Sequence, residues 1–254
     1  VLAADPLLRT LEGHKSNVYG VAVTAGGRQA VSASADKTLK VWDLESGREL
    51  NTLAGHLGNV WCVAATPNGS RAVSGSSAKT VGVWDLKQGR RHSSLAGHAA
   101  DVYCVAITSD GKRAVSGDRS GKLIAWDLEA GRQRVPLKGH GAAATGLAIT
   151  ADGKQLVSSS WDMTLAVWDL ESGRQVHTLK GHLQALQCVS LSREGQLGAS
   201  GDANRQLKIW NLQTGVELRT ITGHAHHVVS SAAFTPDGKR ILSGSWDNTV
   251  RAWD

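Results

Sequence analysis

The sequence repeats with a period of 42 residues, and this repeat restricts the possible folds more than any other feature. Gly-His occurs six times at that spacing, with its histidines at His14, His56, His98, His140, His182 and His224. Trp-Asp follows at Trp42, Trp84, Trp126, Trp168 and Trp253, and the fifth copy has Trp210-Asn211 instead. The sixth copy carries one extra residue after its histidine. Such a period predicts an array of supersecondary units, each of which buries its core against its neighbours.

Each copy reads as four short strands. In the first copy, "NVYGVAVT", "QAVSAS", "TLKVWD" and "RELNTL" are separated by the turns "AGG", "ADK" and "LESG". This spacing of strands is typical of all-β proteins. The turns "SDGK", "ADGK" and "PDGK" supply an Asp that can bond its own backbone and a Gly that tolerates positive φ. No stretch of the chain has a helical pattern.

A repeat of this length with four strands and the Gly-His and Trp-Asp pairs resembles the WD-repeat family of β-propellers. The resemblance implies an all-β fold, a closed β-propeller of six four-stranded blades that occupies residues 1–254 as a single domain. The repeats start near Gly13, Gly55, Gly97, Gly139, Gly181 and Gly223. Most members of the family have seven blades, so whether a seventh repeat is missing stays open at this point.

The last copy ends at Trp253-Asp254 and lacks a fourth strand of its own. "PLLRTLEGH" near the start of the chain aligns with "RELNTLAGH" of the first full copy. Because an unpaired edge strand is a liability, we expect residues 7–11, from Leu7 to Leu11, to complete the last blade and close the ring.

The resemblance also implies a hydrogen-bonded set of His, Ser, Asp and Trp inside each blade. The expected members are His14, Ser32, Asp36 and Trp42 in blade 1, His140, Ser158, Asp162 and Trp168 in blade 4, and His224, Ser243, Asp247 and Trp253 in blade 6. Buried polar groups must be paired, so this set favours a structural role over catalysis. At the Asp position blades 2, 3 and 5 have Ala78, Ser120 and Asn204, so these three blades are expected to lack the carboxylate and to be softer.

The three cysteines, Cys62, Cys104 and Cys188, form no CxxC pair and are odd in number. This excludes a simple disulfide framework and a cysteine zinc site, and it favours a reducing, cytoplasmic compartment. We aligned them with Gly20, Gly146 and Ser230 in the other copies, which indicates a slot for small side chains near the ring axis. No apolar run approaches the ~18 residues of a membrane span, so no membrane partner is expected.

Aromatic residues outside the Trp-Asp pairs fall at two aligned positions. Tyr19, Trp61 and Tyr103 lie five residues after the repeat histidine, and Trp161 and Trp246 lie seven before the repeat tryptophan. Because antiparallel strands alternate in direction, both positions border the same face of the ring. Arg119, aligned with Trp161, and the polar residues Asn17, Asn59 and Asp101 accompany them, whereas blade 5 offers only Gln187 and Ala203.

Trp, Tyr and Arg with a polar rim are typical of protein and peptide binding sites. We therefore expect a scaffold or recruitment module that binds a protein or peptide on this face, resembling propellers of prokaryotic signalling proteins. It would be a monomer or one domain of a larger protein.

Two alternatives stay open. The opposite face carries Arg71, Arg90, Arg91, Lys112, Arg113, Lys239 and Arg240, which suits nucleic acid or an acidic partner, and the formal net charge is +6. However, Asp110, Asp152, Asp237, Glu45 and Glu171 are interleaved with these cations and favour a mixed, solvated surface. The other alternative is an engineered or consensus ring without a natural ligand.

Signals for an enzyme are poor. "GDRSGKL" from Gly117 is one residue short of a P-loop and does not precede a helix. His226 and His227 stand beside His224 without a carboxylate, which is a weak metal motif. The sequence therefore predicts neither catalysis, nor a cofactor, nor a metal site.

Overall fold

A computed structural model of the chain describes residues 9–24, 26–225 and 228–254, and all of its regular structure is β. The strands form six antiparallel sheets, which we call blades 1 to 6 in chain order, and this confirms the expected all-β array of six units. Blades 1 to 5 have four strands each, and blade 6 has three in the described residues.

The innermost strands of the six blades are β1 (Val18–Val23), β5 (Val60–Ala65), β9 (Val102–Ile107), β13 (Ala144–Ile149), β17 (Leu186–Leu191) and β21 (Val229–Phe234). The second strands are β2 (Gln29–Ser34), β6 (Arg71–Ser76), β10 (Arg113–Asp118), β14 (Gln155–Ser160), β18 (Leu197–Asp202) and β22 (Ile241–Ser245). The third are β3 (Thr38–Asp43), β7 (Thr80–Asp85), β11 (Leu123–Asp127), β15 (Leu165–Asp169), β19 (Gln206–Asn211) and β23 (Val250–Trp253). The outer strands are β4 (Glu49–Ala54), β8 (Arg90–Ala96), β12 (Arg132–Pro136), β16 (Gln175–Leu179) and β20 (Val216–Thr222).

Neighbouring blades pack face to face through apolar side chains. Val31 and Leu39 of blade 1 meet Val60 and Trp84 of blade 2, and each of these four side chains is completely buried. The other neighbouring blades repeat this arrangement with equivalent residues. The second and third strands of blades 1 to 5 are therefore buried on both sides, whereas the outer strands are largely exposed. Stacking between blades thus supplies the core, as expected for a repeat array.

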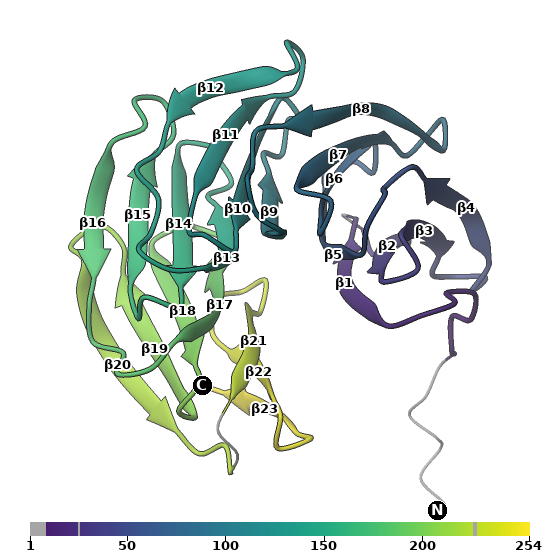
Figure 1. The fold of residues 1–254 in the computed structure, drawn as a ribbon. Coiled ribbons are helices and arrows are strands. Elements are labelled where there is room, and N and C mark those ends of the chain that lie inside the picture. Colours follow the sequence, from purple (N-terminus) through teal and green to yellow (C-terminus); the bar gives the residue numbers. More distant parts are fainter. Residues whose placement is uncertain (1–8, 25, 226–227) are drawn as a thin grey trace, which may run out of the picture.

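The blades follow one another around an axis, with the outer strands β4, β8, β12, β16 and β20 on the rim (Figure 1). Blade 6, in yellow, stands apart from blade 1, in purple, and leaves an opening between them (Figure 1). Side chains flanking this opening are exposed where their equivalents are buried: Val18 is 48% exposed and Val60 0%, and Val250 is 75% exposed and Leu39 0%. Both surfaces beside the opening are therefore faces that elsewhere join two blades.

The expected closing strand falls partly outside the described residues, because Leu7 and Leu8 are not among them. Arg9 to Leu11 are described and belong to no strand, and β23 pairs only with β22 among the described residues. Arg9 lies against Gly47, in the same way that Asn51, its equivalent one repeat later, lies against Gly89. Arg9 thus lies against blade 1 as the outer strand of blade 1 lies against blade 2. Closure of the ring through residues 7–11 stays a prediction.

The described residues contain no helix that is long and apolar enough to cross a membrane.

Candidate functional site

A β-bulge at the start of every innermost strand presents the residues that sequence analysis singled out. In blade 1 Val18 pairs with Ser34 and Gly20 with Ala33, so the intervening Tyr19 has no partner on β2. The equivalent bulged residues are Trp61, Tyr103, Thr145, Gln187 and Ser230. Because a bulged residue is released from the alternation of the strand, its side chain can be aimed away from the packed interior.

Four aromatic side chains form a continuous row on this face. The ring centroids of Tyr19 and Trp61 are 4.6 Å apart, those of Trp61 and Tyr103 6.1 Å, and those of Tyr103 and Trp161 6.3 Å. Tyr19 is 45% exposed and Trp161 43%, while Trp61 and Tyr103 are half-buried. We call these four residues the aromatic row. It crosses blades 1 to 4 and joins residues that are far apart in the chain.

In blades 4 and 6 the aromatic residue lies in the turn between the second and third strands and not at the bulge. Blades 4 and 6 have the small residues Thr145 and Ser230 at the bulge and carry Trp161 and Trp246 in the turn. Trp161 reaches Tyr103 of the preceding blade. Trp246 is 71% exposed and belongs to the blade beside the opening, so the structure does not bring it into the row.

The polar residues predicted for this face lie next to the same turns. The carbonyl oxygens of Asn17, Asn59 and Asp101 accept hydrogen bonds from the backbone N–H groups of Ala35, Ser77 and Arg119, at 2.9 Å in each case. These bonds tie the segment that enters each innermost strand to the neighbouring turn. Arg119 is exposed, and Gln187 of blade 5 occupies the bulge equivalent to that of Tyr19.

Below the aromatic row lies a cavity of 290 Å³ on the axis, and all six innermost strands contribute to it. Cys62, Cys104 and Cys188 line this cavity. Burial raises the pKa of the Cys62 and Cys188 thiols to about 12 and that of Cys104 well above its usual value. These thiols are therefore protonated at neutral pH, in agreement with a packing role. One alignment was wrong: the extra residue of the sixth copy precedes β21, so Ser231, and not Ser230, occupies the cysteine slot.

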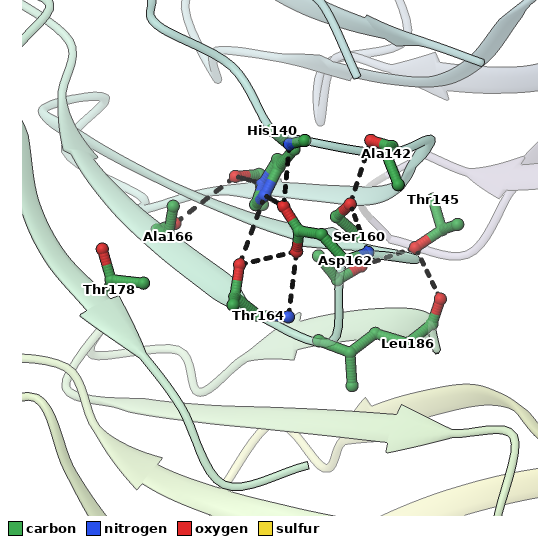
Figure 2. A network of polar contacts seen from close by, with 12 residues as sticks. His140, Ala142, Thr145, Ser160, Asp162, Thr164, Ala166, Thr178 and Leu186 are labelled. Atoms are coloured by element: carbon green, nitrogen blue, oxygen red, sulfur yellow. Dashed lines mark hydrogen bonds and ion pairs between the residues drawn. The ribbon is translucent and has the colours of Figure 1, made fainter. Parts of the chain in front are cut away.

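The polar set of blade 4 is a chain of hydrogen bonds from an indole to a carboxylate, and Figure 2 shows its His140, Asp162 and Thr164 members. Trp168 Nε1–H donates to Ser158 Oγ at 2.8 Å, and Ser158 Oγ lies 2.7 Å from His140 Nε2. His140 Nδ1 lies 3.0 Å from Asp162 Oδ2, and since a carboxylate only accepts, this nitrogen carries the proton. The other Asp162 oxygen accepts a hydrogen bond from the Thr164 hydroxyl at 2.7 Å.

Electrostatics keep the carboxylate of this set ionised. Burial acts to raise the pKa of Asp162, but the hydrogen bonds from Thr164 and Gly141, with a smaller electrostatic contribution from His140, outweigh it, and the pKa is lowered overall. Burial lowers the pKa of His140 despite the nearby Asp162 charge, so the imidazole is neutral. The expected sets of blades 1 and 6 have the same bonds, in His14, Ser32, Asp36 and Trp42 and in His224, Ser243, Asp247 and Trp253.

The expectation that three blades lack the carboxylate was wrong for two of them. In blade 3, Asp118 Oδ2 lies 2.7 Å from His98 Nδ1, and in blade 5, Asp202 Oδ2 lies 2.8 Å from His182 Nδ1. Asp118 and Asp202 are the last residues of the second strands of their blades, two residues before the expected position. Because the turn that follows is short, a carboxylate at the strand end and one in the turn can both reach the repeat histidine. The strings "SGDRSGK" and "SGDANRQ" contain this signal.

Only blade 2 lacks a carboxylate partner among the described residues. Its His56 Nε2 lies 2.7 Å from Ser74 Oγ, and Ser76 and Ala78 occupy the two positions that carry Asp elsewhere. Burial, with a smaller contribution from the Arg91 charge, lowers the pKa of His56 to about 4.

The opposite face is a mixed surface in which several cations are already paired. Arg113 and Arg134 both contact Glu171, and Arg240 contacts Asp254 at 2.8 Å. Arg71 donates to the Gly111 carbonyl at 2.9 Å. Arg91 was wrongly expected there, because its guanidinium donates to the carbonyl of Gly55, directly before His56. The weak metal motif at His226 and His227 lies outside the described residues.

Comparison with known proteins agrees with this architecture. The family model described as "WD domain, G-beta repeat" matches six times, at residues 5–43, 47–85, 89–127, 131–169, 173–211 and 215–254. The matches cover nearly the whole chain, so this protein belongs to the WD40 family. The first match begins at residue 5 and therefore includes residues 7–11 at the place of an outer strand.

Two curated relatives are similar over about one repeat. The vegetative incompatibility protein HET-E-1 of Podospora anserina is 54% identical over 39 residues, which is 15% of this chain and 3% of that protein. The nuclear distribution protein PAC1 of Yarrowia lipolytica is 54% identical over 43 residues, 17% of this chain and 10% of that protein. The aligned region thus spans only a small part of either relative.

Proposed function

We propose that this protein is a non-catalytic interaction module that holds a protein or peptide partner on the face that carries the aromatic row. One observation carries the proposal: Tyr19, Trp61, Tyr103 and Trp161 come from four blades and meet in one partly exposed row. Aromatic side chains bury a large area at low entropic cost, and they are enriched where proteins bind proteins.

The scaffold suits this role because the repeated positions stabilise the blades, whereas the variable positions lie on the face proposed to bind the partner. The histidine, serine and tryptophan of each blade bond to one another inside the blade, whereas the bulged residue and the turn differ from blade to blade. WD repeats generally mediate protein–protein interaction. We place the protein as a monomer in the cytoplasm, in signalling, alone or as one domain of a larger protein.

A nucleic-acid ligand on the opposite face is the less favoured alternative. The pairing of Arg113, Arg134 and Arg240 with carboxylates leaves that face without an unbroken basic stripe. An engineered ring without a ligand would give no partner at all, so the same experiment tests it.

The test is affinity capture from a lysate with the wild type and with the variant Tyr19→Ala, Trp61→Ala, Tyr103→Ala. The matched control is Val216→Ala, Leu218→Ala, which removes two exposed apolar side chains of β20 on the rim. We expect the aromatic variant to lose a partner that the wild type and the control retain. Equal recovery by all three proteins, at equal thermal stability, would refute the assignment of the face.

A further inference from the structure

Exposed cations stand in turns on the face that carries the aromatic row, and they indicate the charge of a fitting partner. We propose that the partner's binding segment is an acidic peptide that places an apolar or aromatic anchor on the aromatic row and its carboxylates on the turn cations. This inference rests on the proposed function and deepens it, because it names the charge and the anchor of the segment that the face binds.

The cations stand in the turns between the second and third strands. Lys37, Lys79 and Arg205 occupy the same turn position, with φ of 71°, 63° and 65°, and all three side chains are exposed. Arg119 occupies the turn position that Trp161 has in blade 4, and it too is exposed. Lys37 and Lys79 belong to blades 1 and 2, the blades that also carry Tyr19 and Trp61. None of these four cations takes part in an ion pair among the described residues.

The carboxylates of the same turns are already engaged beneath the surface. Asp36, Asp162 and Asp247 contact a repeat histidine, as do Asp118 and Asp202. Their side chains are between 0% and 22% exposed. A partner approaching these turns therefore meets ammonium and guanidinium groups, and Asp101 is the one carboxylate named for this face that contacts no histidine among the described residues. The partner's carboxylates would find cations that have no competing ion pair in the described structure.

The geometry of the row favours a peptide over single-stranded nucleic acid. The planes of neighbouring rings are inclined by 50°, 86° and 57° along the row. Base recognition on such platforms uses ring faces on which successive bases stack. Here neighbouring rings point edges and tilted faces at one another, so the row offers no continuous stacking platform.

The test selects ligands from a phage-displayed library of random dodecapeptides on the immobilised wild-type chain and on two variants. The first variant is Lys37→Glu, Lys79→Glu, Arg119→Glu, Arg205→Glu. The second is a control with the same change of net charge on the opposite face: Arg28→Glu, Lys112→Glu, Lys154→Glu, Lys239→Glu, all exposed residues of turns between the first and second strands. A fluorescent peptide of the selected consensus and a labelled oligo(dT) strand then serve as titration probes.

We expect the wild type and the opposite-face variant to select peptides with a Trp, Phe or Leu flanked by Asp and Glu. We expect the turn variant to bind the consensus peptide at least ~10-fold more weakly, since four exposed charge contacts become repulsive. Two results would overturn the proposed acidic character of the peptide: selected peptides without acidic enrichment, or equal affinity of the consensus peptide for all three proteins. If Trp61→Ala abolishes binding in either case, the proposed function of the aromatic row still stands. Tighter binding of oligo(dT) than of the peptide would overturn it in favour of nucleic acid. No selected peptide at all would contradict the proposed function itself.

Discussion

Replacing Asp202 with Ser tests whether the displaced carboxylate of blade 5 stabilises the ring. Asp202 and His182 are both completely buried as side chains, and Asp202 Oδ2 lies 2.8 Å from His182 Nδ1. The other oxygen accepts hydrogen bonds from the backbone N–H groups of Asn204, at 2.8 Å, and Gln206, at 3.0 Å. Ser at this position makes blade 5 resemble blade 2, where Ser76 Oγ still accepts a bond from the Ala78 N–H at 3.1 Å.

The expected loss follows from the two donors that Ser cannot reach, His182 Nδ1–H and the Gln206 N–H. A buried donor left without a partner costs about 1–3 kcal/mol, so the Asp202→Ser variant should lose about 2–6 kcal/mol of unfolding free energy. Equilibrium urea unfolding at neutral pH, followed by tryptophan fluorescence, measures it. The control is Asp101→Ser on the same side of the ring, whose carboxylate makes no hydrogen bond among the described residues. A loss no larger than that of the control would refute the reasoning.

Three further predictions concern the interior and the opening. Val60→Ala should cost about 2 kcal/mol and Val18→Ala about half of that, because only Val60 is fully buried; equal costs in urea unfolding would mean that the ring closes over Val18 in solution. His56 has a pKa of about 4 in the folded chain and its ordinary pKa of about 6.5 in the unfolded chain. Between these two pH values the unfolded chain therefore binds more protons than the folded chain. Stability should thus be complete above about pH 6.5 and fall by up to ~3 kcal/mol toward pH 4, with a flatter profile for His56→Gln; the same slope in both proteins contradicts this. Cys62, Cys104 and Cys188 should react with iodoacetamide at least ~100-fold more slowly in the native protein than in denaturant, because their raised pKa leaves little thiolate; rapid native labelling would contradict the raised pKa of these thiols.

Much of the architecture was predictable because the repeat carries it. Gly-His and Trp-Asp recur because Trp168, Ser158 and His140 and their equivalents bond in the same way in every blade. The alternation of strand direction was enough to place Tyr19 and Trp161 on one face before any coordinate was known.

Other features could not be read from aligned positions. Asp118 and Asp202 stand two residues away from the family position, and only the shape of the turn shows that both places reach the same imidazole. The bulge at Tyr19 arises from the pairing of β1 with β2, in which Tyr19 has no partner. The sequence of neither strand shows where a residue is skipped, so the bulge could not be predicted.

The sequence by itself determined the number of repeats, the four-strand unit and the His, Ser and Trp members of the polar sets, because each is set by local periodicity and repeated chemistry. Only the tertiary structure decided that Tyr19, Trp61, Tyr103 and Trp161 touch, and that blade 6 stands apart from blade 1. The physical reason is that both depend on how one blade is rotated against the next. That rotation arises from packing between blades, which a single repeat does not encode.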